Sequence, residues 1–379
     1  MDSLRKRLKI AVLHRTFCAS AGGAEAYAVA VALDLSQRHE VHVFAQTMDT
    51  SFQTVTFHPV ALFFKRPRWL NQLWYATATW WLTREGFDIV HSHENTWHGN
   101  IQTVHVIPMR CKNSADGLWR KLKFLTSPRL WTYAALEFFR FRVNYKRLWV
   151  AVSSPLLQQL QQMRPPLPDS QLFSIAPGIY PRTNEDRGKT QKPHFFIDTT
   201  ANSKILLWVG NDAVKKNLQT VLKALSVLDS SYKLLVVGKA LPLTHWQEQL
   251  EALGIADRVK FLGVVRVMSE IYASVDLLLH PSLEDTFGMV VLEAMLFGLP
   301  VVVSPSEHCG IAADLQHGLN AFILADPKDA EAMKVAVLEL SQPPVLAKYQ
   351  DNSVAFANNY LWPHVAAQYE VLYQQVLSA

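Results

Sequence analysis

The chain has 379 residues, of which 49% are hydrophobic and 18% charged, with 15 glycines and 19 prolines. This balance excludes a disordered or collagen-like chain and indicates two globular domains, at about 100–200 residues per domain. The formal charge of +5 predicts an anionic partner, such as a phosphorylated substrate, a nucleic acid or a membrane surface.

Three cysteines, Cys18, Cys111 and Cys309, are widely spaced and odd in number, so we expect neither a disulfide framework nor a zinc site. No apolar run is long enough for a spanning helix, which needs about 18 residues. The apolar stretch after the basic N-terminal residues is also too short for a signal peptide. These features predict a cytoplasmic protein without an anchor of its own.

The first half of the chain opens with a β-α-β pattern. Residues 8–13 predict a strand, 24–35 a helix and 40–45 a second strand, with Gly22 and Gly23 in the loop before the helix. Further strands are predicted at 88–93 and 149–153. Residues 181–203 lack apolar periodicity and are expected to form an interdomain linker.

Strands and helices alternate again from residue 204. This alternation predicts a parallel sheet covered on both faces, and because it occurs twice we expect two doubly wound domains. Ligands of such folds bind beyond the carboxyl ends of the strands, so the cleft between the domains is the expected site. The predicted strands are 205–210, 233–238, 259–262, 277–280 and 300–303, and the predicted helices are 218–228, 246–253, 268–273 and 289–297.

The strongest chemical signal lies between Asp285 and Glu293. Glu293 is the only polar residue of the helix predicted over 289–297, so it needs a polar partner in an apolar setting: a ligand's hydroxyls, or a structural Arg or Lys. Eight helical residues separate the carboxylates of Asp285 and Glu293 by about 12 Å. At that distance they cannot share a proton, but they could hold the two ends of an elongated ligand. The helix N-terminus near Gly288 could bind an anion between them, although Asp285 or Thr286 could equally be a simple helix cap.

This segment resembles the E-x7-E signature of retaining family 4 glycosyltransferases, whose GT-B fold has two Rossmann-like doubly wound domains facing across a cleft. Glu293 matches the second glutamate, and Asp285 stands where the family usually has the first. The resemblance implies that Asp285 contacts the donor hexose and Glu293 the donor ribose. Residues 175–181, 209–212 and 277–281 are similar, within that family, to bacterial glucosyltransferases of the lipopolysaccharide inner core.

The resemblance also gives roles to three weaker motifs. Lys216 matches a family lysine that neutralises the donor diphosphate, whereas Asn211 replaces the usual arginine, so Lys215 is expected to supply the second charge. The Gly22–Gly23 loop matches a glycine-rich loop, and His105 a strand-end histidine that contacts the donor sugar. The implied donor-binding residues are Gly22, Gly23, Gly210, Lys215, Lys216, Asp285, Phe287, Gly288, Met289 and Glu293, and the implied catalytic residues are Asp285, Lys216 and His105.

Basic and aromatic residues are interleaved between residues 109 and 147, where ten basic residues and two acidic ones give a local charge of +8. Such a segment suits an anionic membrane surface, although aromatics that pack on the domain are an alternative. Single-stranded RNA binding uses the same ingredients, but no nucleic-acid motif accompanies them. The predicted membrane-binding residues are Arg120, Lys121, Lys123, Trp131, Phe138, Phe139, Arg140, Phe141 and Arg142.

The sequence therefore predicts a retaining glycosyltransferase that moves a hexose from a nucleotide diphosphate sugar, such as UDP-glucose, to a lipid-linked saccharide such as the lipopolysaccharide inner core. Residues 1–180 and a returning helix within 362–379 would bind the acceptor, and 204–361 the donor. We expect no metal or cofactor, and a peripheral location on the inner face of the bacterial inner membrane. The alternatives are a transferase of another cell-surface polysaccharide, a sugar-nucleotide epimerase, and a non-catalytic RNA- or nucleotide-binding protein.

Overall fold

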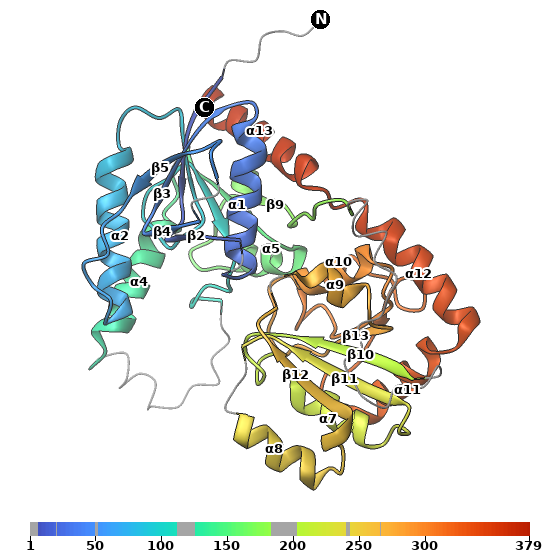
Figure 1. The fold of residues 1–379 in the computed structure, drawn as a ribbon. Coiled ribbons are helices and arrows are strands. Elements are labelled where there is room, and N and C mark those ends of the chain that lie inside the picture. The colour runs from blue at the N-terminus through green and yellow to red at the C-terminus, as the bar shows by residue number, and fades with distance from the viewer. Residues whose placement is uncertain are drawn as a thin grey trace, which may run out of the picture. The chain divides into compact units, whose positions relative to one another are not determined.

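The computed structural model describes residues 7–19, 21–49, 52–111, 126–182, 203–239, 243–265 and 267–379. The chain forms two compact units (Figure 1). Unit 1 comprises Met1–Gly178 and Trp362–Ala379, and unit 2 comprises Ile179–Leu361. The predicted linker, 181–203, begins inside unit 2, and residues 183–202 lie outside the described part of the chain.

Unit 1 is built on a parallel sheet of seven strands. Their order reverses between β1 and β6, so the carboxyl ends of these two strands form the switch point at which doubly wound folds bind ligands. Thr16–Phe17 (β2) and Thr47–Met48 (β4) form a separate two-stranded sheet. The order of the large sheet is β5 (Thr56–Pro59), β3 (Glu40–Ala45), β1 (Lys9–Leu13), β6 (Ile89–Ser92), β7 (Ile101–Val104), β8 (Leu148–Ala151) and β9 (Leu172–Ser174).

Helices cover both faces of this sheet. Tyr75 of α2 (Arg68–Thr83) packs against Ala11 and Leu13 of β1, and α2 contacts α4 (Pro128–Arg140). On the other side of the sheet, α1 (Gly23–Ser36) packs against α13 (Trp362–Ser378) (Figure 1). The eight-residue α5 (Ser154–Gln161) joins β8 to β9. Helix α2 was not predicted, because its tryptophans and threonines favour strands when judged by propensity alone.

A chain of buried hydroxyl and imidazole groups ties α13 to the sheet. The Tyr369 hydroxyl lies 2.8 Å from both the Tyr27 hydroxyl of α1 and the Thr103 hydroxyl of β7. Thr103 Oγ1 lies 2.8 Å from His91 Nε2, and His91 Nδ1 lies 2.8 Å from the Tyr373 hydroxyl. Burial lowers the pKa of His91 to about 3, so its imidazole is neutral at physiological pH. The returning helix is thus bonded into the core of unit 1.

Unit 2 has a parallel sheet of six strands, whose order reverses between β10 and β13. Leu206, Trp208, Leu234 and Val236 point from β10 and β11 into the core on one face. The runs of leucine and valine in these strands reflect burial on both sides, as parallel strands require. The order is β12 (Val259–Gly263), β11 (Tyr232–Val237), β10 (Lys204–Val209), β13 (Leu277–His280), β14 (Val301–Val303) and β15 (Phe322–Ile323).

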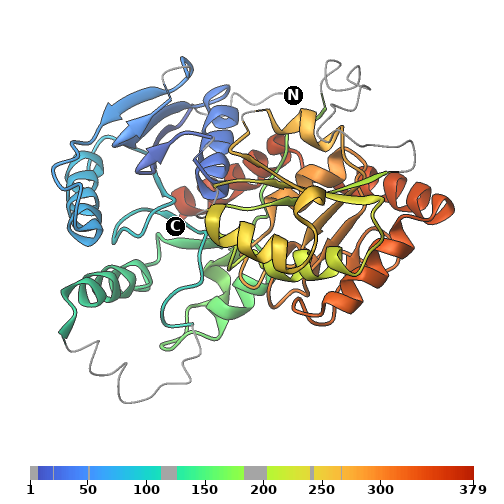
Figure 2. The same cartoon turned by 60° about the horizontal axis from the view of Figure 1, so that its bottom comes forward.

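The helices of unit 2 divide between the two faces of its sheet. Three of them, α7 (Leu218–Ser226), α8 (Leu243–Ala252) and α11 (Ala330–Leu340), supply most of the helical residues of the core cluster just described, to which α12 (Pro343–Ala357) adds Tyr349. Figure 2 gives a second view of these helices. The others are the short α9 (Met268–Tyr272), α10 (Met289–Leu296), which packs on β13 and β14, and α12, which packs on α10. The strand β15 and helices α11 and α12 lie beyond the predicted alternation. No helix within the described ranges has the length and apolar character needed to cross a bilayer.

Replacing Tyr369 with phenylalanine tests the hydroxyl chain. The variant leaves the Tyr27 and Thr103 hydroxyls without their shared buried partner, so we expect unit 1 to lose about 1–3 kcal/mol of stability. The melting temperature, followed by circular dichroism, measures the effect. Tyr145→Phe is the matched control, because Tyr145 is exposed and its hydroxyl has no such partners among the described residues. Equal melting temperatures for the two variants would contradict the role given to the chain.

Candidate active site

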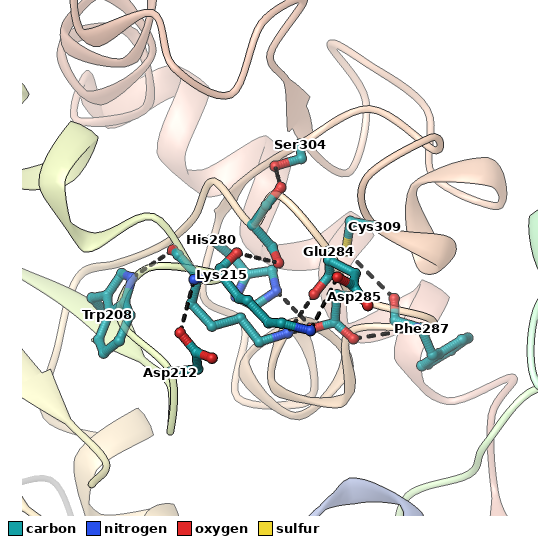
Figure 3. Close-up of polar contacts among 11 residues, drawn as sticks. Trp208, Asp212, Lys215, His280, Glu284, Asp285, Phe287, Ser304 and Cys309 are labelled. Atoms are coloured by element: carbon teal, nitrogen blue, oxygen red, sulfur yellow. Dashed lines mark hydrogen bonds and ion pairs between the residues drawn. The ribbon is translucent and has the colours of Figure 1, made fainter. Parts of the chain in front are cut away.

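Two loops meet at the switch point of unit 2. One follows β10 and carries Gly210 to Lys216, and the other follows β13 and precedes α10. Two hydrogen bonds join them: the backbone amide of Leu283 donates to the Lys215 carbonyl at 2.7 Å, and the Ser282 hydroxyl donates to the same oxygen at 3.3 Å. Ser304, after β14, supports the second loop by donating to the Ser282 carbonyl at 2.6 Å (Figure 3).

A cation, an imidazole and a carboxylate come together between these loops. Lys216 Nζ lies 2.5 Å from Asp285 Oδ2, and His280 Nε2 lies 3.1 Å from the same oxygen. An ionised carboxylate only accepts hydrogen bonds, so Nε2 of His280 carries the proton that is donated. Lys216 Nζ also donates to the Glu284 carbonyl at 3.3 Å. Figure 3 shows His280 and Asp285 converging on this point.

The cluster fixes the ionisation of Asp285. Burial alone would raise the pKa of its carboxyl group, but the hydrogen bond from His280 and the charge of Lys216 outweigh burial and hold that pKa well below its ordinary value. Asp285 is therefore negative throughout the physiological range, and it neutralises most of the charge of Lys216. A ligand that binds here must exchange partners with this pair.

A second, more exposed ion pair lies beside the first. Lys215 Nζ is 3.0 Å from Glu284 Oε2, with both side chains about half exposed. Asp212 Oδ1 accepts the backbone amides of Val214 and Lys215 at 3.1 and 2.9 Å, which fixes the turn that presents the two lysines (Figure 3). The predicted pair of cations is therefore present, but each lysine faces a carboxylate.

Glycine is required where the backbone passes close to this site. A Cβ on Gly210 would lie 2.7 Å from the Trp208 ring and 2.9 Å from the Lys216 side chain. Gly288, which precedes α10, has a φ of 104° and would place a Cβ 2.8 Å from the sulfur of Cys309. Both contacts are tighter than side chains tolerate, and the positive φ also favours glycine. These two glycines of the predicted set are explained by packing.

Glu293 has a partner that the sequence did not predict. The Tyr272 hydroxyl of α9 donates to Glu293 Oε2 at 2.8 Å, in place of the Arg or Lys considered above. Burial raises the pKa of Glu293, and the bond from Tyr272 opposes that rise only in part. The helix is also less uniformly buried than expected, since Met289, Val290 and Glu293 are half-buried on one side. Glu293 therefore lies on the least covered face of α10.

The remaining predicted site residues lie in both units, with His105, Gly22 and Gly23 in unit 1 and Phe287 in unit 2. His105 follows β7, and its Nε2 lies 3.0 Å from Nδ1 of His93. Gly23 begins α1 and Gly22 is its N-cap, with an extended φ of 170° that any residue adopts. Phe287 lies in unit 2, buried before α10, and its carbonyl accepts the Cys309 thiol at 3.4 Å. The predicted set thus falls into two groups, one in each unit.

Part of the predicted membrane surface is wrong. Arg140 is only 5% exposed, and its guanidinium donates to Gln102 Oε1 at 3.1 Å and the Thr103 carbonyl at 2.7 Å. Phe141 is equally buried and stacks on Trp149. The sequence did not indicate that Arg140 and Phe141 point inward, because they alternate with exposed aromatic residues. Trp131, Phe138, Phe139 and Arg142 are exposed, and Arg120, Lys121 and Lys123 lie outside the described residues.

Comparison with known proteins gives this geometry a class. Residues 21–182 match the model for glycosyltransferase family 4, and residues 203–342 match that for glycosyl transferases group 1. The lipopolysaccharide glucosyltransferase WaaG of Escherichia coli is 28% identical over 204 residues, 51% of this chain and 54% of that protein. The chain thus spans about half the length of this relative. The N-acetyl-alpha-D-glucosaminyl L-malate synthase of Bacillus anthracis is 25% identical over 98% of both chains.

Solved structures show the same fold. The crystal structure of WaaG superposes with a TM-score of 0.76 at 22% identity, covering 95% of this chain and 99% of that one. Anabaena HepE in complex with UDP-glucose gives 0.73 at 19% identity, covering 97% and 99%. The two doubly wound units have the GT-B architecture of these glycosyltransferases, and the two family models give the chain its class. The chain belongs to this family of enzymes, with its family 4 domain in unit 1 and its group 1 domain in unit 2.

Glu293→Gln tests the electrostatics of α10. The raised pKa means that folded Glu293 keeps its proton to a higher pH than the unfolded chain does, so its ionisation costs stability as the pH rises above about 4.3. Glutamine still accepts from Tyr272 without that cost. We expect the variant to melt above the wild type at pH 8, with the difference shrinking toward pH 4.

The matched control is Glu331→Gln on α11, since Glu331 is exposed and its side chain is paired only at the surface. For this control, the change in melting temperature between pH 4 and pH 8 should be close to that of the wild type. A Glu293→Gln protein that melts below the wild type at pH 8 would show that the ionised carboxylate stabilises the fold.

Proposed function

We propose that the protein is a retaining glycosyltransferase that uses a nucleotide diphosphate sugar, with UDP-glucose the first candidate, and glycosylates a lipid-linked saccharide. The observation that carries the proposal is the cluster of Lys216, His280 and Asp285 at the switch point of unit 2. The fold supports it, since ligands of doubly wound sheets bind at that point. The complex of Anabaena HepE with UDP-glucose supports a uridine nucleotide.

Donor binding is an exchange of ion-pair partners. Lys215 and Lys216 face Glu284 and Asp285 at 3.0 and 2.5 Å in the free protein. A diphosphate offers both lysines oxygen acceptors of higher charge, which frees Asp285 to accept from the hexose hydroxyls while His280 holds it in place. Glu293, on the half-buried side of α10, binds the ribose hydroxyls. The N-terminus of α10 adds the positive end of a helix dipole, which favours an anion.

The same residues favour the reaction. As the bond from the anomeric carbon to the diphosphate oxygen breaks, negative charge grows on the leaving group, where Lys215 and Lys216 stabilise it. The acceptor oxygen bonds to that carbon on the same face and gives its proton to the departing phosphate oxygen. The configuration is thereby retained without a separate base, and the lysines supply the counter-charge that a metal would otherwise provide.

The acceptor would be held by unit 1 at a membrane surface. Helix α4 buries charged side chains and exposes aromatic ones, the reverse of the usual arrangement. Glu137 and Arg140 point inward, whereas Trp131, Phe138 and Phe139 are about half exposed. Arg110 lies over the Phe138 ring at 5.2 Å. An apolar face beside cations fits an anionic bilayer, in which aromatic rings sit at the interface. A lipid-linked acceptor requires the enzyme to act at a bilayer surface, and the proposal places it on the cytoplasmic face.

Lys216→Met tests the donor site. Removing a charge-assisted contact to the diphosphate costs about 1.5–3 kcal/mol, so we expect UDP-glucose to bind about 10- to 100-fold more weakly. Calorimetric titration in the presence of EDTA measures the affinity, with GDP- and ADP-glucose titrated for comparison. Lys223→Met, at an exposed lysine of α7, is the control and should bind as the wild type does. Unchanged affinity in Lys216→Met would remove the donor site from the cluster.

Trp131→Ser combined with Phe138→Ser tests the membrane face. Losing two interfacial aromatics should reduce cosedimentation with phosphatidylglycerol vesicles severalfold at low salt. Val371→Ser removes an exposed apolar side chain from α13 and should bind vesicles normally. Vesicle binding that survives the double substitution would exclude α4 as the contact.

A further inference from the structure

The two carboxylates of the proposed donor site have partners of different kinds. Asp285 faces the cation of Lys216, which must turn to the diphosphate before Asp285 can bind the hexose. Glu293 faces the hydroxyl of Tyr272, which carries no charge and donates to Oε2 at 2.8 Å. Glu293 can therefore bind a ligand without an exchange of ion-pair partners.

Tyr272 is held firmly in this contact. Its side chain is only 2% exposed, and its ring packs against that of Phe297, with centroids 5.6 Å apart. Glu293 and Phe297 are four residues apart, so they lie on the same face of α10 and Tyr272 contacts both. The segment after α9 is anchored as well, because Asp276 Oδ2 accepts the backbone amide of Ile205, in β10, at 2.8 Å.

The hydroxyl of Tyr272 restrains Glu293 without neutralising its charge. Among the residues that the structure describes, Tyr272 is the one group that opposes the rise in the pKa of Glu293, so no cation there is close to this carboxylate. An ionised carboxylate accepts hydrogen bonds at about four positions, and Tyr272 occupies one of them. The others are available to ligand hydroxyls, which bond more strongly to a charged acceptor than to a neutral one.

Holding Glu293 in advance favours the ligand that it binds. Fixing a flexible side chain at the moment of binding weakens affinity by about 3- to 10-fold. Glu293 lies on the half-buried face of α10, where an unrestrained side chain would incur that loss. The bond from Tyr272 fixes the carboxylate before the ligand arrives, so the ligand hydroxyls meet an acceptor that is already in place.

We propose that Tyr272 is a positioning residue of the donor site, which holds Glu293 in the free protein so that this carboxylate accepts the ribose hydroxyls of the nucleotide. The inference rests on the proposed function and deepens it, because it gives the site a physical basis for preferring a nucleotide that carries ribose hydroxyls. Tyr272 itself is buried and acts through the carboxylate.

Calorimetric titration of the full chain with UDP and with its dideoxy analogue, which lacks both ribose hydroxyls, tests the proposal. The wild type should bind UDP at least about tenfold more tightly, because the analogue loses hydrogen bonds to a charged group. In Tyr272→Phe we expect UDP to bind about 3- to 10-fold more weakly, whereas the analogue should bind as it does to the wild type. A merely structural effect of the substitution would weaken both nucleotides equally.

Tyr360→Phe is the matched control, because the Tyr360 hydroxyl also donates to a carboxylate of unit 2, that of Asp314, at 3.2 Å. It should leave both affinities unchanged. In the Glu293→Ala background, adding Tyr272→Phe should change UDP affinity by less than about twofold, because Tyr272 acts through that carboxylate alone. This double variant lacks the buried charge that Tyr272 satisfies, so it keeps the proposal testable if Tyr272→Phe alone does not fold.

The inference is overturned if Tyr272→Phe weakens both nucleotides equally, if it weakens neither, or if it further weakens UDP binding in the Glu293→Ala background. UDP binding that depends on Lys216 but shows no preference for ribose hydroxyls would overturn the inference and leave the proposed donor site standing. Failure of the wild type to bind either UDP or UDP-glucose would instead overturn the proposed donor site, and the role of Tyr272 with it.

Discussion

The negative charge of Asp285 is the constraint on which the rest of unit 2 depends. A largely buried carboxylate is stable only with a partner, and here Lys216 and His280 are both within 3.1 Å. Bringing them together requires the loops after β10 and β13 to meet, a strand order that makes these strands neighbours, and a glycine at position 210 beside the lysine. The same contacts therefore determine both the packing of these loops and the charge at the proposed donor site.

The two units use the same topological position for different chemistry. In unit 2 the strand ends carry full charges, which suit a diphosphate and a reaction in which charge develops on the leaving group. In unit 1 they carry stacked neutral imidazoles and an ion pair between Arg15 and Glu94. A doubly wound sheet supplies the location of a site, and the residues just past the strand ends decide what binds there.

The sequence predicted the fold class, which the structure and its neighbours confirm. Buried parallel strands produce apolar runs that are easily recognised, and the regular alternation of these runs with helices indicates a doubly wound sheet. Lys216 and Asp285 were each predicted as donor residues by family resemblance. Their direct contact was not, because 69 residues separate them and no local pattern encodes that distance.

Other features were missed for the same kind of reason. The pairing of Tyr272 with Glu293 joins two helices, and neither helix alone indicates it. His280 ends a strand, and in the sequence nothing distinguishes it from a structural buried histidine. Only the fold brings Asp285 into contact with it. In α4 the aromatic side chains of Trp131, Phe138 and Phe139 are exposed while Arg140 is buried, against the usual rule. A pattern of aromatics and arginines therefore could not show that Arg140 and Phe141 are buried.

The return of α13 to unit 1 has a consequence for synthesis. During synthesis, residues 1–178 emerge from the ribosome long before Tyr369 and Tyr373. Yet these two tyrosines complete the buried hydroxyl chain around His91 and Thr103. Unit 2, by contrast, is continuous in sequence and complete at residue 361. Although domains generally fold in the order of their emergence, here the domain that emerges first is finished last. Unit 1 must therefore wait, partly formed and with a polar gap in its core, until the final helix arrives.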